Sequence, residues 1–334
     1  MEGRGARTVN RLGWIFAVVV SAMVLLPSAR SQAPAEIPRI GILSFAAAPS
    51  GTDPDPDQGV LRGLRELGYV ERLNILIERR YANGQDALLA AQAAELVNLK
   101  VRVILAGGPG PREAAKRATS TVPIITVSGS DPVREGWAQS LAHPGGNITG
   151  FTVTFPGLDL KRLELLKQAF PGIVRVGIVT EFHKQDVMQN LEAGARQLGL
   201  QLHVLEVRGR SEFDAAFKLA RQQGVQALVV VATNIIVAHR SQLAELSISE
   251  RLPSMSEFPV LAQAGFLMTY GADLDELGRL SVIQMDKILK GARPGDLPIE
   301  QPKKFYLTVN LKTAKALGIA IPQSLLLRAD EVIQ

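Results

Sequence analysis

Small polar side chains stand directly after several short apolar runs of this sequence. In IITVSGSDPV (124–133), an apolar stretch gives way to two serines around a glycine, then to an aspartate and a proline. Hydroxyl groups and a carboxylate of this kind can hold a small ligand through hydrogen bonds. They also suit a turn that starts a helix, because Asp131 can cap it and Pro132 fits its first position. Two interpretations therefore stay open, a ligand-binding loop and a helix start.

The same pattern recurs after the other apolar runs, where small, hydroxyl, amide or aromatic residues follow and cations are few. In an open parallel sheet, ligands bind in the crevice beyond the carboxyl ends of the strands. Three carboxylates could meet in such a cleft. We therefore expect a site for a small, partly polar ligand, made of Ser44, Phe45, Gly108, Pro109, Ser128, Ser130, Asp131, Glu181, Thr233, Asn234, Glu257 and Tyr270.

Catalytic and nucleotide-binding patterns fit this sequence poorly. AGGPGPRE (106–113) stands where a phosphate loop would stand, but two prolines remove amide donors and Glu113 replaces the third glycine of a dinucleotide motif. The chain has no G-x-S-x-G elbow, no H-E-x-x-H and no cysteine, and its four histidines are scattered. We predict a protein that is not an enzyme, with no catalytic residue, no metal site and no cofactor.

The strands and helices that must position these residues are expected to alternate regularly from Arg39 onward. Apolar runs are followed by amphipathic stretches, which predicts βαβ units and parallel sheets covered on both faces. The runs are RIGILSF (39–45), VRVILAG (101–107), VPIITVS (122–128), VRVGIVT (174–180), VQALVVVA (225–232) and FLMTYG (266–271), and helices are expected over 86–99, 160–170 and 276–291. The alternation of strands and helices is interrupted by a Gly/Pro-rich segment near residue 150 and then begins again, so we expect two Rossmann-like α/β lobes. An extended segment, 296–310, indicates a further crossing between them.

The charge balance argues against a nucleic-acid partner. The chain has 37 basic and 32 acidic residues; four of the basic and one of the acidic lie in residues 1–33, which leaves 33 basic and 31 acidic in the remainder. That remainder is too balanced for a phosphate-binding surface.

The N-terminus reads as a signal peptide. A basic region precedes an apolar run of 15 residues (12–26), which is short for a membrane span of about 20, and small residues follow. An uncleaved anchor is the alternative. Since the chain has no cysteine, it cannot carry a lipid-modified one, so we predict an exported periplasmic protein that is not a lipoprotein, with a signal peptide over 1–33.

Longer stretches resemble a known family. They include GLRELGYVE (63–71), AAKRATSTVPIITVSGSDPV (114–133), SLAHPGGNITG (140–150), KRLELLKQAFP (161–171) and PKKFYLTVNLKTAKALGIAIPQSLLLRADEVI (302–333). From about Arg39 to the C-terminus, the chain resembles the substrate-binding proteins of ABC transporters, in the tryptophan/tyrosine-type group with the type I periplasmic-binding-protein fold. The resemblance implies a monomer that captures a small molecule, such as an amino acid, and delivers it to an ABC permease in the inner membrane.

The resemblance also implies how the lobes are divided and where the ligand site has changed. Lobe 1 is expected to contain 39–152 and 272–298, and lobe 2 to contain 153–271 and 299–334, joined by a multi-strand hinge. The sequence departs from the family at Gly107–Pro111, where the family often has G-G-T-P-A, at Ala232–Asn234, where an Asp-Pro pair is frequent, and at Glu181–His183, where an Asn-Pro turn is more usual. These departures fall at the expected cleft and leave the ligand open.

Two other functions stay open. An exported sensor would present the ligand to a receptor, and an adjacent kinase gene in place of permease and ATPase genes would favour it. An exported α/β enzyme would convert the bound compound, whereas a binding protein returns it unchanged.

Overall fold

The computed structural model describes Met1, Gly3 and residues 36–49, 55–155, 157–181 and 185–334. The chain divides into an N-terminal part, Met1–Glu36, and one compact unit, Ile37–Gln334. The signal peptide predicted over 1–33 lies, but for Met1 and Gly3, outside the described residues. Within the described residues, no helix is long and apolar enough to cross a membrane.

The first half of the compact unit builds a parallel sheet, called here the first sheet. Its strands lie in the order β2, β1, β3, β4, β5, and each pairs in parallel with its neighbour. The inner residues of β1 and β3 are apolar and buried, as their continuous apolar runs predict for strands covered on both faces, whereas the edge strand β2 is mostly polar and half-buried. The bounds are β1 Arg39–Ser44, β2 Leu76–Tyr81, β3 Val103–Gly107, β4 Ile124–Ser128 and β5 Ile148–Thr152.

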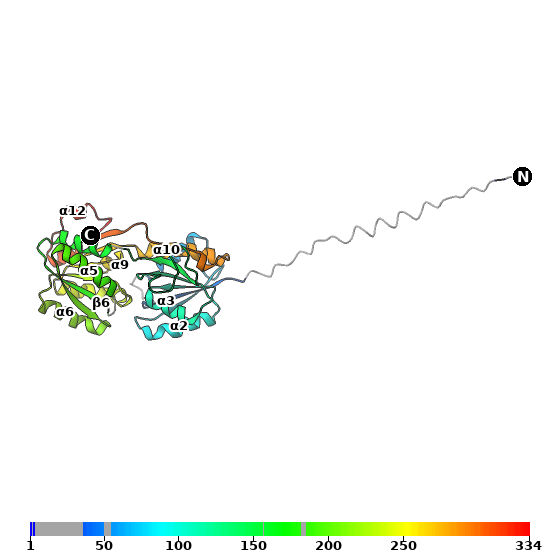
Figure 1. Cartoon of the computed structure of the whole chain (residues 1–334), viewed down its shortest axis with the longest axis horizontal. Helices are drawn as coiled ribbons and strands as arrows, with labels where there is room; N and C mark the ends of the chain where they lie inside the picture. The colour runs from blue at the N-terminus through cyan, green and yellow to red at the C-terminus, as the bar shows by residue number, and fades with distance from the viewer. Residues whose placement is uncertain (2, 4–35, 50–54, 156, 182–184) are drawn as a thin grey trace. The chain divides into compact units, whose positions relative to one another are not determined.

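The helices of the first sheet come from two distant parts of the chain. They are α1 Gln58–Glu66, α2 Asp86–Asn98, α3 Pro109–Ala118 and, from much later in the sequence, α10 Leu274–Leu289. Two glycines of α1, Gly59 and Gly63, let α10 approach so closely that a Cβ atom on either would collide with the backbone of α10. The buried side chains of Val282, Met285 and Ile288 then complete the core under the first sheet. Figure 1 shows α10, in orange, among the blue and cyan elements of this sheet.

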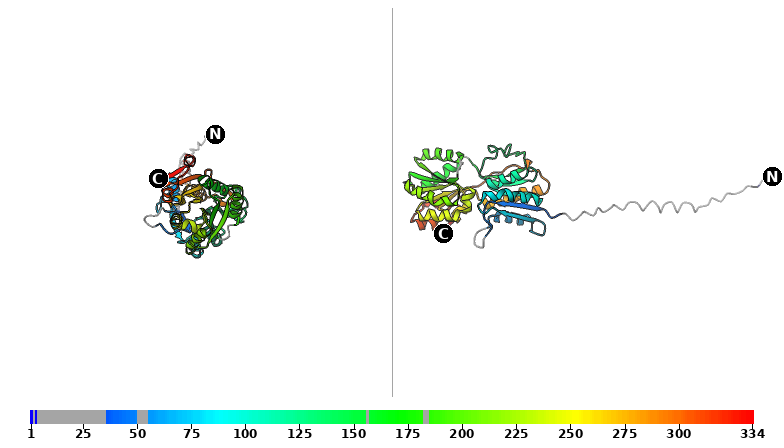
Figure 2. Two further views of the ribbon diagram at one scale, coloured as in Figure 1. Left: turned by 90° about the vertical axis from the view of Figure 1, so that its left-hand side faces the viewer. Right: turned by 90° about the horizontal axis from the view of Figure 1, so that it is seen from below.

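A second sheet is built from the remaining strands. Its order is β12, β11, β10, β9, β8, β6, β7. The strands are β6 Arg175–Glu181, β7 Gln201–Val207, β8 Ala227–Val230, β9 Ser254–Ser256, β10 Met268–Gly271, β11 Tyr306–Asn310 and β12 Glu331–Ile333. Its helices are α4 Leu158–Ala169, α5 Gln185–Leu198, α6 Phe213–Gln222, α7 Asn234–Ala238, α8 Arg240–Ser249, α9 Pro259–Gln263, α11 Leu311–Leu317 and α12 Gln323–Leu326, with short 3₁₀ turns at Arg210–Glu212 and, beside the first sheet, Pro294–Asp296. Figure 2 shows the green and yellow elements of this sheet as a body beside the blue, cyan and orange ones.

The chain passes between the two sheets at several points. It leaves the first sheet after β5, returns after β10 to form α10, and then runs beside β5 before joining the second sheet at β11. The return is fixed by backbone hydrogen bonds, from Glu300 N to Gly150 O at 2.8 Å and from Thr152 N to Glu300 O at 3.0 Å. The crossing that the sequence predicts within 296–310 is therefore confirmed.

The predicted strands and helices are confirmed, each within a few residues of its expected bounds. One expectation is wrong. No helix follows Asp131 and Pro132: the segment closes a single turn, with Glu135 N donating to Asp131 O at 3.0 Å, and Gly136 then adopts a left-handed φ of 69°. The second sheet is mainly parallel, as predicted, with one antiparallel pair among the described strands. Strand β11 pairs antiparallel with β10, because the crossing segment enters the sheet from the opposite end.

Candidate functional site

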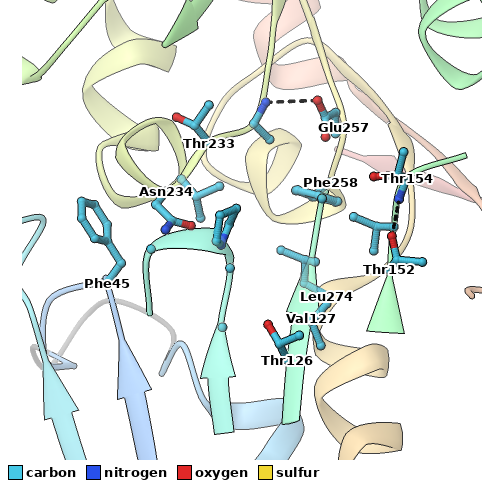
Figure 3. A pocket seen from close by; sticks show the side chains of 18 of the residues that line it. Phe45, Thr126, Val127, Thr152, Thr154, Thr233, Asn234, Glu257, Phe258 and Leu274 are labelled. Atoms are coloured by element: carbon cyan, nitrogen blue, oxygen red, sulfur yellow. Dashed lines mark hydrogen bonds between the residues drawn. The ribbon is translucent and has the colours of Figure 1, made fainter. Parts of the chain in front are cut away.

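A cavity of about 1080 Å³ lies where the carboxyl ends of strands from both sheets meet. Its lining includes the residues that follow β1, β3, β4 and β5 of the first sheet and those that follow β8 and β9 of the second. This is the place where open α/β sheets bind ligands. Figure 3 shows the side chains of both origins around the same space.

The structure brings most of the predicted site residues together. Those in the lining are Ser44, Phe45, Gly108, Pro109, Asp131, Glu181, Thr233, Asn234 and Glu257. The remaining predicted residues, Ser128, Ser130 and Tyr270, are not in the lining. A direct role for any of the twelve in ligand binding stays a prediction.

The two serines of the opening motif face a buried arginine. Arg112 of α3 is 4% exposed, and its Nη1 donates to Ser130 Oγ at 2.7 Å and to Ser128 Oγ at 3.1 Å. Its Nη2 donates to Glu135 at 2.8 Å, and its guanidinium lies 5.1 Å from the ring centre of Trp137. One side chain therefore fixes the loop 128–137 at four points. Sequence reasoning missed Arg112, although it stands directly after the glycine-rich segment.

Asp131 makes a cap without a helix. Its Oδ1 accepts hydrogen bonds from the backbone N–H groups of Val133 at 3.0 Å and Arg134 at 3.1 Å. Asp131 also lines the cavity. The carboxylate of Asp131 therefore stabilises a turn in place of a helix, and the residue also belongs to the lining of the cavity.

The side chain of Asn234, which follows β8 of the second sheet, lies next to Gly108 and Gly110, which follow β3 of the first sheet. Gly108, with φ 86°, precedes α3, and a Cβ atom there would collide with Asn234 Oδ1. A Cβ atom on Gly110 would lie 3.2 Å from Asn234 Nδ2. The amide of Asn234 therefore rests over the first turn of α3, where a larger residue than glycine would force it away (Figure 3).

Three threonines of the lining make hydrogen bonds within the protein through their hydroxyl groups. Thr126 donates to Ala106 O at 2.7 Å and Thr152 donates to Ser130 O at 2.9 Å. Thr233 caps α7, since its hydroxyl accepts from Ile236 N at 3.4 Å. These contacts hold the strand ends in place. Thr126 and Thr152 were not among the predicted residues; for Thr152, the alternation in ITGFTVTF (148–155) was the available signal.

Asp57 is a second residue that sequence reasoning missed. It precedes α1, lines the cavity and is 7% exposed, and its Oδ2 accepts from the Tyr81 hydroxyl at 2.9 Å. Burial raises the pKa of Asp57 from the ordinary 3.8 to about 6, against the opposing effect of the Tyr81 hydrogen bond. The run DPDPD (53–57) could have drawn attention to it.

Other carboxylates of the lining are tied to neighbouring groups. Glu257 Oε1 accepts from Ala232 N at 3.2 Å, as Figure 3 shows. Asp159 accepts from Arg162 Nη1 at 2.8 Å, and Arg162 Nε donates to Tyr270 O at 2.9 Å. The apolar part of the lining includes Phe45 and two residues not expected from the sequence, Phe258 and Leu274. Such a space suits a small molecule with a polar end and an apolar body.

The described residues offer no evident metal centre. Within the ranges that the structure describes, no group of three or more His, Cys, Asp or Glu side chains is placed to hold a metal ion.

Comparisons with known proteins agree with this architecture. Residues 39–333 match the model of the family described as ABC transporter substrate binding protein. A curated tyrosine-binding protein of Clostridioides difficile (strain R20291) is 26% identical over 265 residues, which are 78% of this chain and 76% of that protein.

Solved structures share the fold. An ABC domain from Streptococcus pneumonia in complex with L-Trp is 24% identical, with a TM-score of 0.79 over 89% of this chain and 99% of that one. A conserved domain protein from Vibrio cholerae is 22% identical, with a TM-score of 0.80 over 89% of this chain and 100% of that one. A leucine-binding protein from Thermotoga maritima is 15% identical, with a TM-score of 0.53 over 76% of this chain and 83% of that one. The fold is accordingly the type I periplasmic-binding-protein fold predicted from the sequence.

Proposed function

Because this chain belongs to the family of ABC transporter substrate-binding proteins, we propose that it captures a small polar or amino-acid-like solute in the cavity and delivers it to a permease of the inner membrane. The observation that carries this proposal is the composition of the cavity wall. Strand ends of both sheets contribute to it, so a ligand in the cavity would contact both bodies at once.

Two comparisons support an amino-acid-like solute. One relative is named for tyrosine, and a protein of the same fold was solved with L-Trp. The lining also combines carboxylates and amides with aromatic and aliphatic side chains, which suits a compound with a charged end and an apolar body.

Capture would work through closure of two lobes. We propose that 39–152 with 272–298 forms lobe 1 and 153–271 with 299–334 forms lobe 2, with the crossings as the hinge. A ligand that contacts both lobes stabilises the form in which they are closest, and the permease would read that form. The basic, then apolar N-terminal segment supports export to the periplasm, where the protein would act as a monomer.

A pair of glycine variants can test the cavity directly. Gly107 lines the cavity, its φ lies outside the left-handed region, and no atom lies within 4 Å of the position of a Cβ there. In Gly107→Trp, the indole therefore grows into the ligand space. Gly172 has the same freedom but is exposed and outside the lining, so Gly172→Trp is the matched control.

The measurement is calorimetric titration of both variants and the wild type with amino acids and related amines. At least one compound should bind the wild type and Gly172→Trp with one-to-one stoichiometry, and Gly107→Trp should lose that binding while it melts close to the wild type. Equal binding by Gly107→Trp would place the ligand elsewhere, and conversion of the compound during the titration would indicate an enzyme.

A further inference from the structure

The cavity wall carries a strong excess of negative charge. Among the described residues that line it, six are acidic and two are basic: Asp57, Asp86, Asp131, Asp159, Glu181 and Glu257 against Arg134 and Arg162. The whole chain has the opposite sign, with a formal net charge of +5. We propose that the cavity selects a ligand with a net positive charge, an amine with an apolar body and no free carboxylate, and that Asp57 is a specificity-determining partner of its ammonium group. The inference rests on the proposed function and narrows the class of its ligand.

Both cations of the lining, Arg134 and Arg162, already interact with other groups of the protein. Arg162 uses Nη1 for Asp159 and Nε for Tyr270 O. Thr126 and Thr152 donate their hydroxyl hydrogens to backbone carbonyls. An amino acid would therefore bring a carboxylate into a space whose charge opposes it.

The N-terminus of α3 has few free amide hydrogens with which to bind an anion. A helix N-terminus ordinarily offers several amide hydrogens to one. Here Pro109 and Pro111 have no amide hydrogen, and Gly108 N donates to Val127 O at 2.9 Å. Between 108 and 111, this leaves the amide of Gly110, over which the Asn234 side chain lies.

Asp57 is placed to receive a cation. Asp57 belongs to the lining although it is 7% exposed, and its carboxylate accepts a hydrogen bond from the neutral hydroxyl of Tyr81. Arg79, which favours the charge of Asp57 more weakly, is paired with Glu71 at 2.8 Å. A buried carboxylate is costly unless it is paired, so a ligand ammonium group would relieve that cost on binding.

Matched pairs of amino acids and their amides can test the charge class. L-Tyrosine and L-tyrosinamide, L-tryptophan and L-tryptophanamide, and L-leucine and L-leucinamide share a side chain and an ammonium group, but only the first of each pair carries a carboxylate. By calorimetry at pH 7.5, the amide of the pair that binds best should bind at least tenfold more tightly than its acid. Equal or tighter binding of the acid would overturn the charge class and leave the proposed function standing. Binding of neither member of any pair would overturn both.

The role of Asp57 is tested with the same probes. Asp57→Asn should weaken binding of the best amide at least tenfold. It should change binding of the acid less than threefold, because the acid loses the same ammonium partner but is also freed from repulsion between its carboxylate and Asp57. Asp214, an exposed residue of α6 outside the lining, supplies the control, and Asp214→Asn should change neither. An unchanged ratio of amide to acid in Asp57→Asn would assign the selectivity to other carboxylates and overturn the role of Asp57.

Discussion

Replacement of Asp57 by asparagine should make the ligand-free protein more stable at pH 7.5. The carboxyl of Asp57 has an ordinary pKa of 3.8 in the unfolded chain and a pKa raised to about 6 by burial in the folded one. A pKa that is higher in the folded state means that ionisation opposes folding. At 1.36 kcal/mol per pH unit, the charged carboxylate costs about 3 kcal/mol at pH 7.5.

The sign of this effect fixes its dependence on pH. The cost is complete above the folded pKa of about 6 and disappears as the pH falls below the unfolded value of 3.8. At pH 4.5 it has fallen to about 1 kcal/mol. The side chain of asparagine is neutral at both pH values, and its Oδ1 can still accept a hydrogen bond from the Tyr81 hydroxyl. Because the amide remains a buried polar group, we expect Asp57→Asn to recover about 1 to 3 kcal/mol at pH 7.5.

Differential scanning calorimetry at pH 7.5 and 4.5 measures this gain, with Asp214→Asn as the control. The melting temperature of Asp57→Asn should rise by several degrees at pH 7.5 and by clearly less at pH 4.5, while the control stays near the wild type. A lower melting temperature at pH 7.5, or the same rise at both pH values, would show that the charge of Asp57 does not oppose folding.

Further predictions concern the loop 128–137 and processing. Arg112→Met should lower the free energy of unfolding by roughly 1.5–3 kcal/mol, because it removes charge-assisted hydrogen bonds to two buried hydroxyls and to the exposed Glu135, whereas Arg117→Met, at a side chain 80% exposed, should be nearly neutral in thermal denaturation. Asp131→Asn should keep the melting temperature, because asparagine caps as well as aspartate, and should weaken binding of the ligand at least tenfold by calorimetry; intact binding would reduce Asp131 to a cap. The intact mass of the exported protein should lack roughly 29 to 33 N-terminal residues, and recovery of the full chain in the membrane fraction would contradict a signal peptide.

Local sequence patterns were sufficient to predict most of the fold but only part of the candidate site. An apolar run such as VRVGIVT (174–180) determines its own burial, so the strand could be predicted without knowledge of its neighbours. The direction of β11 could not, because it depends on the path that the preceding crossing takes. The prediction of a helix at Asp131 was wrong, because the capping hydrogen bond forms but no helical stretch follows it.

The site depends on contacts between residues far apart in the sequence. Ser128 and Ser130 look like ligand contacts when only their own loop is considered, but Arg112 occupies their hydroxyls from another helix. The raised pKa of Asp57 likewise comes from packing around α1, and only the aspartates of its own segment were visible in the sequence. Strand ends predict where a cavity forms; partners from elsewhere decide which side chains are available in it.

Native mass spectrometry tests the central claim, that a small molecule binds in the cavity, most directly. The exported protein would be incubated with the low-molecular-weight fraction of a rich growth medium and transferred without dialysis. We predict one non-covalent adduct per chain in the wild type and in Gly172→Trp, lost on denaturation, and none in Gly107→Trp. A wild-type protein without an adduct, or the same adduct in Gly107→Trp, would contradict it.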